Sequence, residues 1–109
     1  MNDKLLSLLG MCRKANKLSC GHDGAVGAAR SGKAKLCLLS NDSSDRLRKE
    51  AEREIGFTKE RIPIAVTQYS MAEIGKATGL KSAVVTVNDE GFAKAMLSLL
   101  ETETEVNAW

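Results

Sequence analysis

The sequence predicts a single α/β domain in which a central sheet carries helices on both faces. Short apolar runs that are typical of buried strands alternate with segments that carry helix start and stop signals. Such alternation favours a layered arrangement of helices and strands. With 109 residues, of which 43% are hydrophobic, the chain is long enough and apolar enough to bury one core.

The first third of the chain is expected to contain two helices with a short strand between them. Residues 3–15 carry apolar side chains at helical spacing, and Asp3 stands where it can cap the first turn. Residues 16–20 are predicted to form the strand. The second helix is predicted over 22–31 and ends at Gly32, a residue type common at helix C-termini. The apolar positions of the first helix are Leu5, Leu8, Leu9 and Cys12.

The middle of the chain is expected to supply two strands and a long charged helix. The continuous apolar run at 36–40 is typical of a strand that is buried on both faces. A helix is predicted over 43–55, and Gly56 ends it. The next strand is predicted over 62–66, with Pro63 near its beginning because proline donates no ladder hydrogen bond. The candidate N-caps of the helix are Asn41, Asp42, Ser43 and Ser44.

A further helix and strand are expected near the C-terminus. Ser70 and Glu73 form the pattern of a capping box, which predicts a helix that begins there and ends at Gly79. The apolar and β-branched run at 83–87 is predicted to be a strand.

The last predicted helix begins at Asn88 or Asp89, either of which can cap it, and runs through Leu100. Residues 1–100 are therefore expected to form the domain, and residues 101–109 an acidic C-terminal tail.

The charge is distributed unevenly along the chain. Residues 1–40 hold seven Lys and Arg against two Asp, a net charge of +5, whereas residues 41–109 hold nine basic against twelve acidic side chains, a net charge of −3. Such asymmetry suggests a half of the molecule that faces nucleic acid, although ordinary solvated surface charge gives the same counts. Aromatic residues make up only 4% of the chain, which disfavours base stacking as the main mode of binding.

The cysteines and the histidine do not suggest a metal site. Cys12, Cys20 and Cys37 are odd in number and lack C-x-x-C spacing, and His22 is the only histidine. The cysteines are therefore expected to be reduced residues of a cytoplasmic protein. No apolar segment of the sequence is long enough to span a membrane, so no membrane association is expected.

Three glycines mark the start of the second predicted helix. The spacing Gly21-x-x-Gly24-x-x-Gly27 places free backbone N–H groups where an anion can bind, with Arg30, Lys33 and Lys35 close by in sequence. The spacing matches neither the dinucleotide fingerprint nor the phosphate loop of nucleotide-hydrolysing enzymes. The alternative is that the glycines allow close packing of the helix on the sheet.

Two polar pairs follow predicted strands. His22 and Asp23 are adjacent and point in different directions on a helix, so they are not expected to act as a catalytic pair. Asp23 is expected to cap the helix or to accept from base N–H groups, and His22 to lie in solvent or against a nucleotide. Asn41 and Asp42 follow a buried strand, where ligands gather in open α/β sheets, although a capping role explains both equally well.

The order of these segments resembles that of a known family. The glycine-led helix start is followed by R-S-G-K-A-K-L-C-L-L-S-N-D, then by I-G-K-A-T-G-L, and then by a valine-rich strand. This order, over residues 3–100, resembles the ribosomal L-seven-Ae family of kink-turn RNA-binding proteins with its L-thirty-e relatives, above all its small bacterial YlxQ-type branch. The resemblance implies a three-layer α/β/α sandwich with a mixed four-stranded sheet.

The resemblance also implies where RNA would bind. In the family a Gly-Thr-Asn-Glu motif at the start of the second helix reads the sheared G·A pairs of a kink-turn, helped by a lysine three residues after the Glu. The matching positions here are Gly21, His22, Asp23 and Gly24, with Gly27 at the lysine position. Glycine thus replaces both the Glu and the Lys, which removes two base contacts of ~1–3 kcal/mol each.

The sequence therefore predicts a non-enzymatic, monomeric RNA-binding protein of the ribosome or of translation that needs no cofactor and no metal. Its expected partners are structured, ribosomal or kink-turn-like RNA and ribosome-associated proteins. Two alternatives stay open: a protein-interaction module that has lost base reading, and a small phosphate- or nucleotide-binding enzyme. The residues expected to contact RNA are Lys17, Gly21, His22, Asp23, Gly24, Arg30, Lys33, Lys35, Asn41, Asp42, Leu80 and Lys81.

Overall fold

The computed structural model describes residues 4–56, 61–103 and 106–107. Its helices are Lys4–Lys14 (α1), His22–Arg30 (α2), Asp45–Ala51 (α3), Met71–Thr78 (α4) and Glu90–Glu103 (α5), and a π-helical turn, Glu52–Gly56 (η1), continues α3. Its strands are Leu18–Cys20 (β1), Leu36–Leu39 (β2), Ile64–Val66 (β3), Val84–Val87 (β4) and Val106–Asn107 (β5). Each helix and strand expected up to residue 100 is present.

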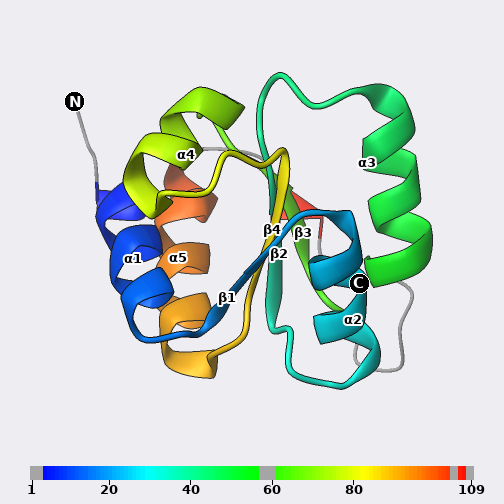
Figure 1. The fold of residues 1–109 in the computed structure, drawn as a ribbon, viewed down its shortest axis with the longest axis horizontal. Coiled ribbons are helices and arrows are strands. Elements are labelled where there is room, and N and C mark those ends of the chain that lie inside the picture. Colours follow the sequence, from blue (N-terminus) through cyan, green and yellow to red (C-terminus); the bar gives the residue numbers. More distant parts are fainter. Residues whose placement is uncertain (1–3, 57–60, 104–105, 108–109) are drawn as a thin grey trace.

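The strands form one mixed sheet in the order β1-β4-β2-β3-β5. Strand β4 is antiparallel to both β1 and β2, β2 is parallel to β3, and β5 is antiparallel to β3. The first four strands are the expected mixed sheet, to which β5 adds two residues. Because β1, β2 and β3 run in the same direction, all three end at one edge of the sheet, uppermost in Figure 1, which we call the carboxyl edge.

Helices cover both faces of the sheet, as Figure 1 shows, so the predicted three-layer α/β/α sandwich is confirmed. Helices α1, α4 and α5 pack on one face, and α2, α3 and η1 pack on the other. Strand β2 lies between the two cores: Leu36 and Leu38 belong to the first, and Cys37 and Leu39 to the second. All four side chains are buried, which explains the uninterrupted apolar run in the sequence.

The helix ends follow most of the predicted capping signals. Ser70 and Glu73 form the expected capping box, and Gly79 adopts the left-handed conformation (φ 83°) that ends α4. At α5 the cap is Asp89, whose Oδ2 accepts from the Phe92 N–H at 2.9 Å. Of the four candidates at α3, Ser44 is the N-cap, since its hydroxyl accepts from the Leu47 N–H. The predicted cap Asp3 lies outside the described residues.

Several boundaries differ from the predictions by a few residues, and the largest differences are at β1 and at the C-terminal tail. The strand expected from residue 16 begins at Leu18, because Asn16 adopts a left-handed conformation (φ 61°) that extended pairing does not allow. The acidic tail expected from residue 101 begins inside α5, which continues to Glu103. Part of that tail also joins the sheet, since Asn107 pairs with Ile64. Within the described residues, no helix has the length and hydropathy needed to cross a membrane.

Candidate nucleic-acid interface

Helix α2 begins at the carboxyl edge with uncapped backbone N–H groups. Its N-cap is Gly21, whose backbone has φ 85° and ψ 161°. Residues other than glycine rarely adopt this conformation. No side chain caps the helix, and the first bond inside it runs from the Ala25 N–H to the Gly21 carbonyl. The N–H groups of the first turn are therefore open to an anion, as the glycine spacing predicted.

Ser82 joins this helix start to the loop between α4 and β4. Its hydroxyl oxygen accepts from the Gly21 N–H at 2.9 Å, and the hydroxyl donates to the Val84 carbonyl at 2.8 Å. The Gly21 N–H also bonds the Val84 carbonyl at 3.0 Å. The loop residues Leu80 and Lys81 are exposed beside it, with Leu80 at 39%. Ser82 was not among the predicted site residues, because a serine before a strand carries no sequence signal for a contact with Gly21.

The turn after β2 lies at the same edge and is held by hydrogen bonds to the chain before α4. The Asn41 Nδ2 donates to the Gln68 carbonyl at 2.8 Å, and the Asp42 Oδ1 accepts from the Met71 N–H at 3.1 Å. Asp42 thus caps α4, and not the helix that directly follows it.

The Asp42 carboxylate is fully exposed and remains charged to a lower pH than usual. The Ser40 hydroxyl and the Met71 N–H beside it lower its pKa, and the Lys81 ammonium adds to the effect. The Ser40 Oγ makes no hydrogen bond among the described residues, so the hydrogen bond from the Met71 N–H is the main cause of the lowered pKa. Asp42 and Lys81 therefore lie close enough to interact across the carboxyl edge.

His22 and Asp23 have different surroundings. The His22 Nε2 lies 2.8 Å from the Glu54 Oε2, so the imidazole ties the start of α2 to η1 while 39% of it stays exposed. His22 was expected to lie in solvent or against a nucleotide, and it instead contacts Glu54 while staying partly exposed. Its Nδ1 is the ring nitrogen that is left to bind a ligand. The Asp23 side chain is exposed on the first turn.

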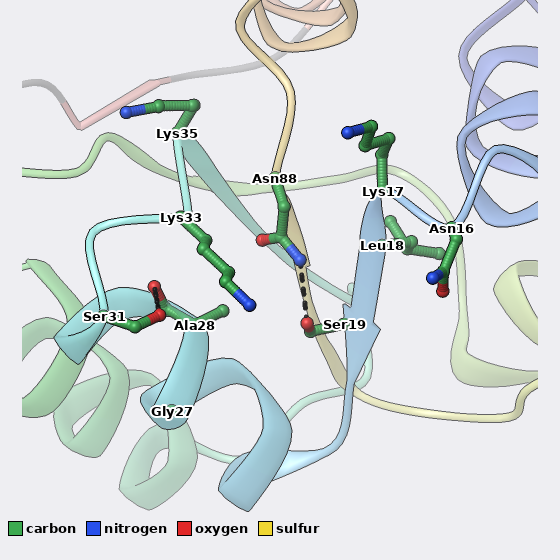
Figure 2. A pocket seen from close by; sticks show the side chains of 10 residues that line it. All are labelled: Asn16, Lys17, Leu18, Ser19, Gly27, Ala28, Ser31, Lys33, Lys35 and Asn88. Atoms are coloured by element: carbon green, nitrogen blue, oxygen red, sulfur yellow. Dashed lines mark hydrogen bonds between the residues drawn. The ribbon is translucent and has the colours of Figure 1, made fainter.

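Three of the four lysines predicted for RNA contact lie away from the carboxyl edge. Lys17, Lys33 and Lys35 line a groove of about 570 Å³ between β1, α2 and the loop that follows α2, shown in Figure 2. Asn88 lies in the same groove and donates from Nδ2 to the Ser19 hydroxyl at 2.8 Å. We call this the lysine groove.

The predicted residues therefore form two groups. Gly21, His22, Asp23, Gly24, Asn41, Asp42, Leu80 and Lys81 lie at the carboxyl edge, and Lys17, Lys33 and Lys35 lie in the lysine groove. Helix α2 connects the two, with Gly24 near the first and Gly27 in the wall of the second. Arg30 is exposed in the last turn of α2, outside both groups.

The fold and the site define a class of protein. It is a three-layer α/β/α sandwich with an uncapped helix start at the carboxyl edge and a lysine-lined groove between β1 and α2. The model of the family described as "Ribosomal protein L7Ae/L30e/S12e/Gadd45 family" matches residues 3–97, and the chain belongs to this family. The resemblance inferred from the sequence is thus confirmed.

The chain is similar to two curated relatives, both named RNA-binding protein YlxQ. The protein from Bacillus subtilis (strain 168) is 34% identical over 95 residues, which are 86% of this chain and 92% of the relative. The protein from Enterococcus faecium is 30% identical over 98 residues, which are 90% of this chain and 92% of the relative. The expected YlxQ-type branch is therefore confirmed.

Solved structures show the same fold. A protein of unknown function from Bacillus halodurans C superposes with a TM-score of 0.82 at 30% identity, over 92% of this chain and 99% of that chain. The Giardia lamblia 15.5kD RNA binding protein superposes with a TM-score of 0.65 at 17% identity, over 94% and 92% of the two chains. At that identity the second likeness concerns the fold alone.

Proposed function

We propose that this protein is a non-enzymatic RNA-binding protein that recognises structured RNA through its carboxyl edge. The observation that carries the proposal is the uncapped start of α2, which Ser82 holds beside the Leu80–Lys81 loop. Family membership and the name shared by the two curated relatives support the same function.

The target we propose is kink-turn-like RNA of the ribosome or of translation, bound by a monomer in the cytoplasm. In this proposal the Asp23 carboxylate accepts from guanine N1–H and N2–H₂, and the free N–H groups of the first turn hold a phosphate. Leu80 packs against a nucleotide that leaves the stack, and Lys81 neutralises a phosphate. Phosphate contacts position the RNA, while Asp23 supplies the base contact in place of the missing Glu.

A nuclear magnetic resonance titration tests where RNA binds. Uniformly ¹⁵N-labelled protein is titrated with a short kink-turn RNA, and the backbone amide shifts are followed. We expect the largest changes at His22, Asp23 and Gly24 and in the loop at Leu80 and Lys81. Changes confined to α1 and α4, on the opposite face of the sheet, would contradict the proposed surface.

A further inference from the structure

The lysine groove carries a positive charge that the fold itself does not use. Among the described residues that line it, three are lysines and none is acidic. Lys35 has a structural partner, since its Nζ donates to the Gly32 carbonyl at 3.3 Å, near the C-terminal end of α2 where a cation is favourable. Lys17 and Lys33 are exposed and form no ion pair with the described side chains. In Figure 2 Lys33 points across the groove toward Asn88 and Ser19.

The polar groups of the groove are held in fixed positions. The buried Thr86 hydroxyl donates to the Asn88 Oδ1 at 3.1 Å, and the Asn88 Nδ2 donates to the Ser19 hydroxyl at 2.8 Å. Within the described residues the Ser19 hydroxyl hydrogen has no acceptor, so it is available to a ligand. Amide and hydroxyl groups beside ammonium groups suit phosphate oxygens and ribose hydroxyls. The lining contains no aromatic side chain among the described residues, so the groove offers no surface for base stacking.

Helix α2 leads from the proposed RNA interface to the groove, since Gly24 lies near that interface and Gly27 lines the groove. Gly24 and Gly27 are exposed and one helical turn apart on α2, on the side that faces β1. A Cβ atom at Gly24 would come no closer than 3.9 Å to the Ser19 Cβ, and one at Gly27 would meet nothing within 4 Å. From Gly21 to Gly27 the helix rises about 9 Å.

We propose that the lysine groove is a second RNA site, which binds the sugar-phosphate backbone of the strand that continues from the carboxyl edge. This inference rests on the proposed function and extends it. The carboxyl edge recognises the RNA structure, and the groove adds sequence-independent contacts from Lys17, Lys33 and Ser19.

The test compares two pairs of charge-neutralising substitutions. Lys17→Gln with Lys33→Gln removes both unpaired cations of the groove, and Lys49→Gln with Lys94→Gln removes two exposed cations on α3 and α5. Dissociation constants for a kink-turn RNA with extended stems are measured against salt concentration. We expect the groove variant to bind roughly tenfold more weakly. Its slope of log K against log salt should fall by about 1.4 to 1.8. The control variant should keep most of the affinity and most of the salt dependence of the wild type.

A second pair of variants separates charge from shape. Gly27→Glu and Gly27→Gln place side chains of equal size in the open space at the wall of the groove. Only Gly27→Glu is expected to weaken RNA binding severalfold, because its carboxylate repels phosphate. Thermal unfolding confirms that both variants fold.

The outcomes separate the inference from the proposed function. If the wild type does not bind the RNA, the proposed function fails. If it binds and the groove and control variants lose affinity equally, the lysine groove is not an RNA site. Binding of poly-L-glutamate that needs Lys17 and Lys33, with RNA binding unchanged by their loss, would overturn the inference in favour of an acidic protein partner.

Discussion

A single hydroxyl connects two segments of the proposed interface. Ser82 Oγ accepts from the Gly21 N–H, although 61 positions separate the two residues, and the hydroxyl donates to the Val84 carbonyl within its own loop. The Gly21 N–H keeps a second acceptor in the Val84 carbonyl. The main role of Ser82 is therefore to hold the loop that contains Leu80 at a fixed distance from the helix start. Its contribution to the stability of the helix start is smaller, because the Gly21 N–H has another acceptor.

Ser82→Ala is expected to lower the free energy of unfolding by about 1 kcal/mol, as a typical lost hydrogen bond does. It is also expected to weaken RNA binding severalfold, because the Leu80–Lys81 loop loses its fixed position. Urea denaturation and RNA titration measure the two effects. Ser82→Thr retains the hydroxyl and should restore both. A variant Ser82→Ala that is less stable but binds RNA normally would limit Ser82 to a structural role.

The lowered pKa of Asp42 predicts a pH dependence of stability. The folded-state pKa lies below the unfolded value of about 3.8, so charged Asp42 contributes stability that is fully present above that value. This contribution is lost as the pH falls through the folded-state pKa. The free energies of unfolding of wild type and Asp42→Asn should therefore differ at pH 7, and urea denaturation should show that difference shrinking as the pH falls below about 3.8. A difference that stays constant over that range would show that charge on Asp42 plays no part.

At the scale of elements, α2 is a helix with two glycines in its interior. Interior glycines cost roughly 0.5–1 kcal/mol each relative to alanine, and neither Gly24 nor Gly27 is needed for close packing. The alternative explanation from the sequence, that these glycines allow the helix to approach the sheet, therefore does not hold for them. Gly75 in α4 does allow a close approach, to the loop that follows that helix, since a Cβ there would meet the Lys81 Cα at 3.0 Å.

Restoring the two side chains should strengthen kink-turn binding. Gly24→Glu with Gly27→Lys adds an acceptor for guanine and a cation on the exposed side of α2. Two base contacts of ~1–3 kcal/mol each correspond to a gain in affinity of roughly thirtyfold at least. Gly24→Gln with Gly27→Gln gives a similar increase in helix propensity without the charges and serves as the control. Equal affinity of both variants for a kink-turn RNA would mean that α2 does not enter the RNA as proposed.

The elements were predictable because local signals agreed with the fold. The apolar run of β2, the capping box of α4 and the glycine after it act within a few residues, so they are visible in the sequence. The π-helical turn η1 was read as the end of an α-helix, because apolar spacing does not distinguish the two. The contacts of His22 with Glu54 and of Ser82 with Gly21 join distant segments and follow only from the topology.

At the scale of the whole molecule, the sheet topology brings the predicted site residues into two groups. The parallel direction of β1, β2 and β3 places the Asn41–Asp42 turn and the start of α2 at one edge, which the rule for open α/β sheets anticipated. The sequence analysis grouped Lys17, Lys33 and Lys35 with that edge because they are close to Gly21 along the chain. Lys17 precedes β1, and Lys33 and Lys35 precede β2, so all three lie at the opposite edge of the sheet. The positive charge of the N-terminal part therefore lies on α1, in the lysine groove and, through Arg30, in the last turn of α2.

The measurement that tests the central claim most directly is a salt titration of binding to a kink-turn RNA and to a plain duplex of equal length. The account predicts tighter binding to the kink-turn at every salt concentration, with log K falling steeply as log salt rises because several phosphates are neutralised. Equal and weak binding to both RNAs would contradict it, and would favour the alternative that this fold serves as a protein-interaction module that has lost base reading.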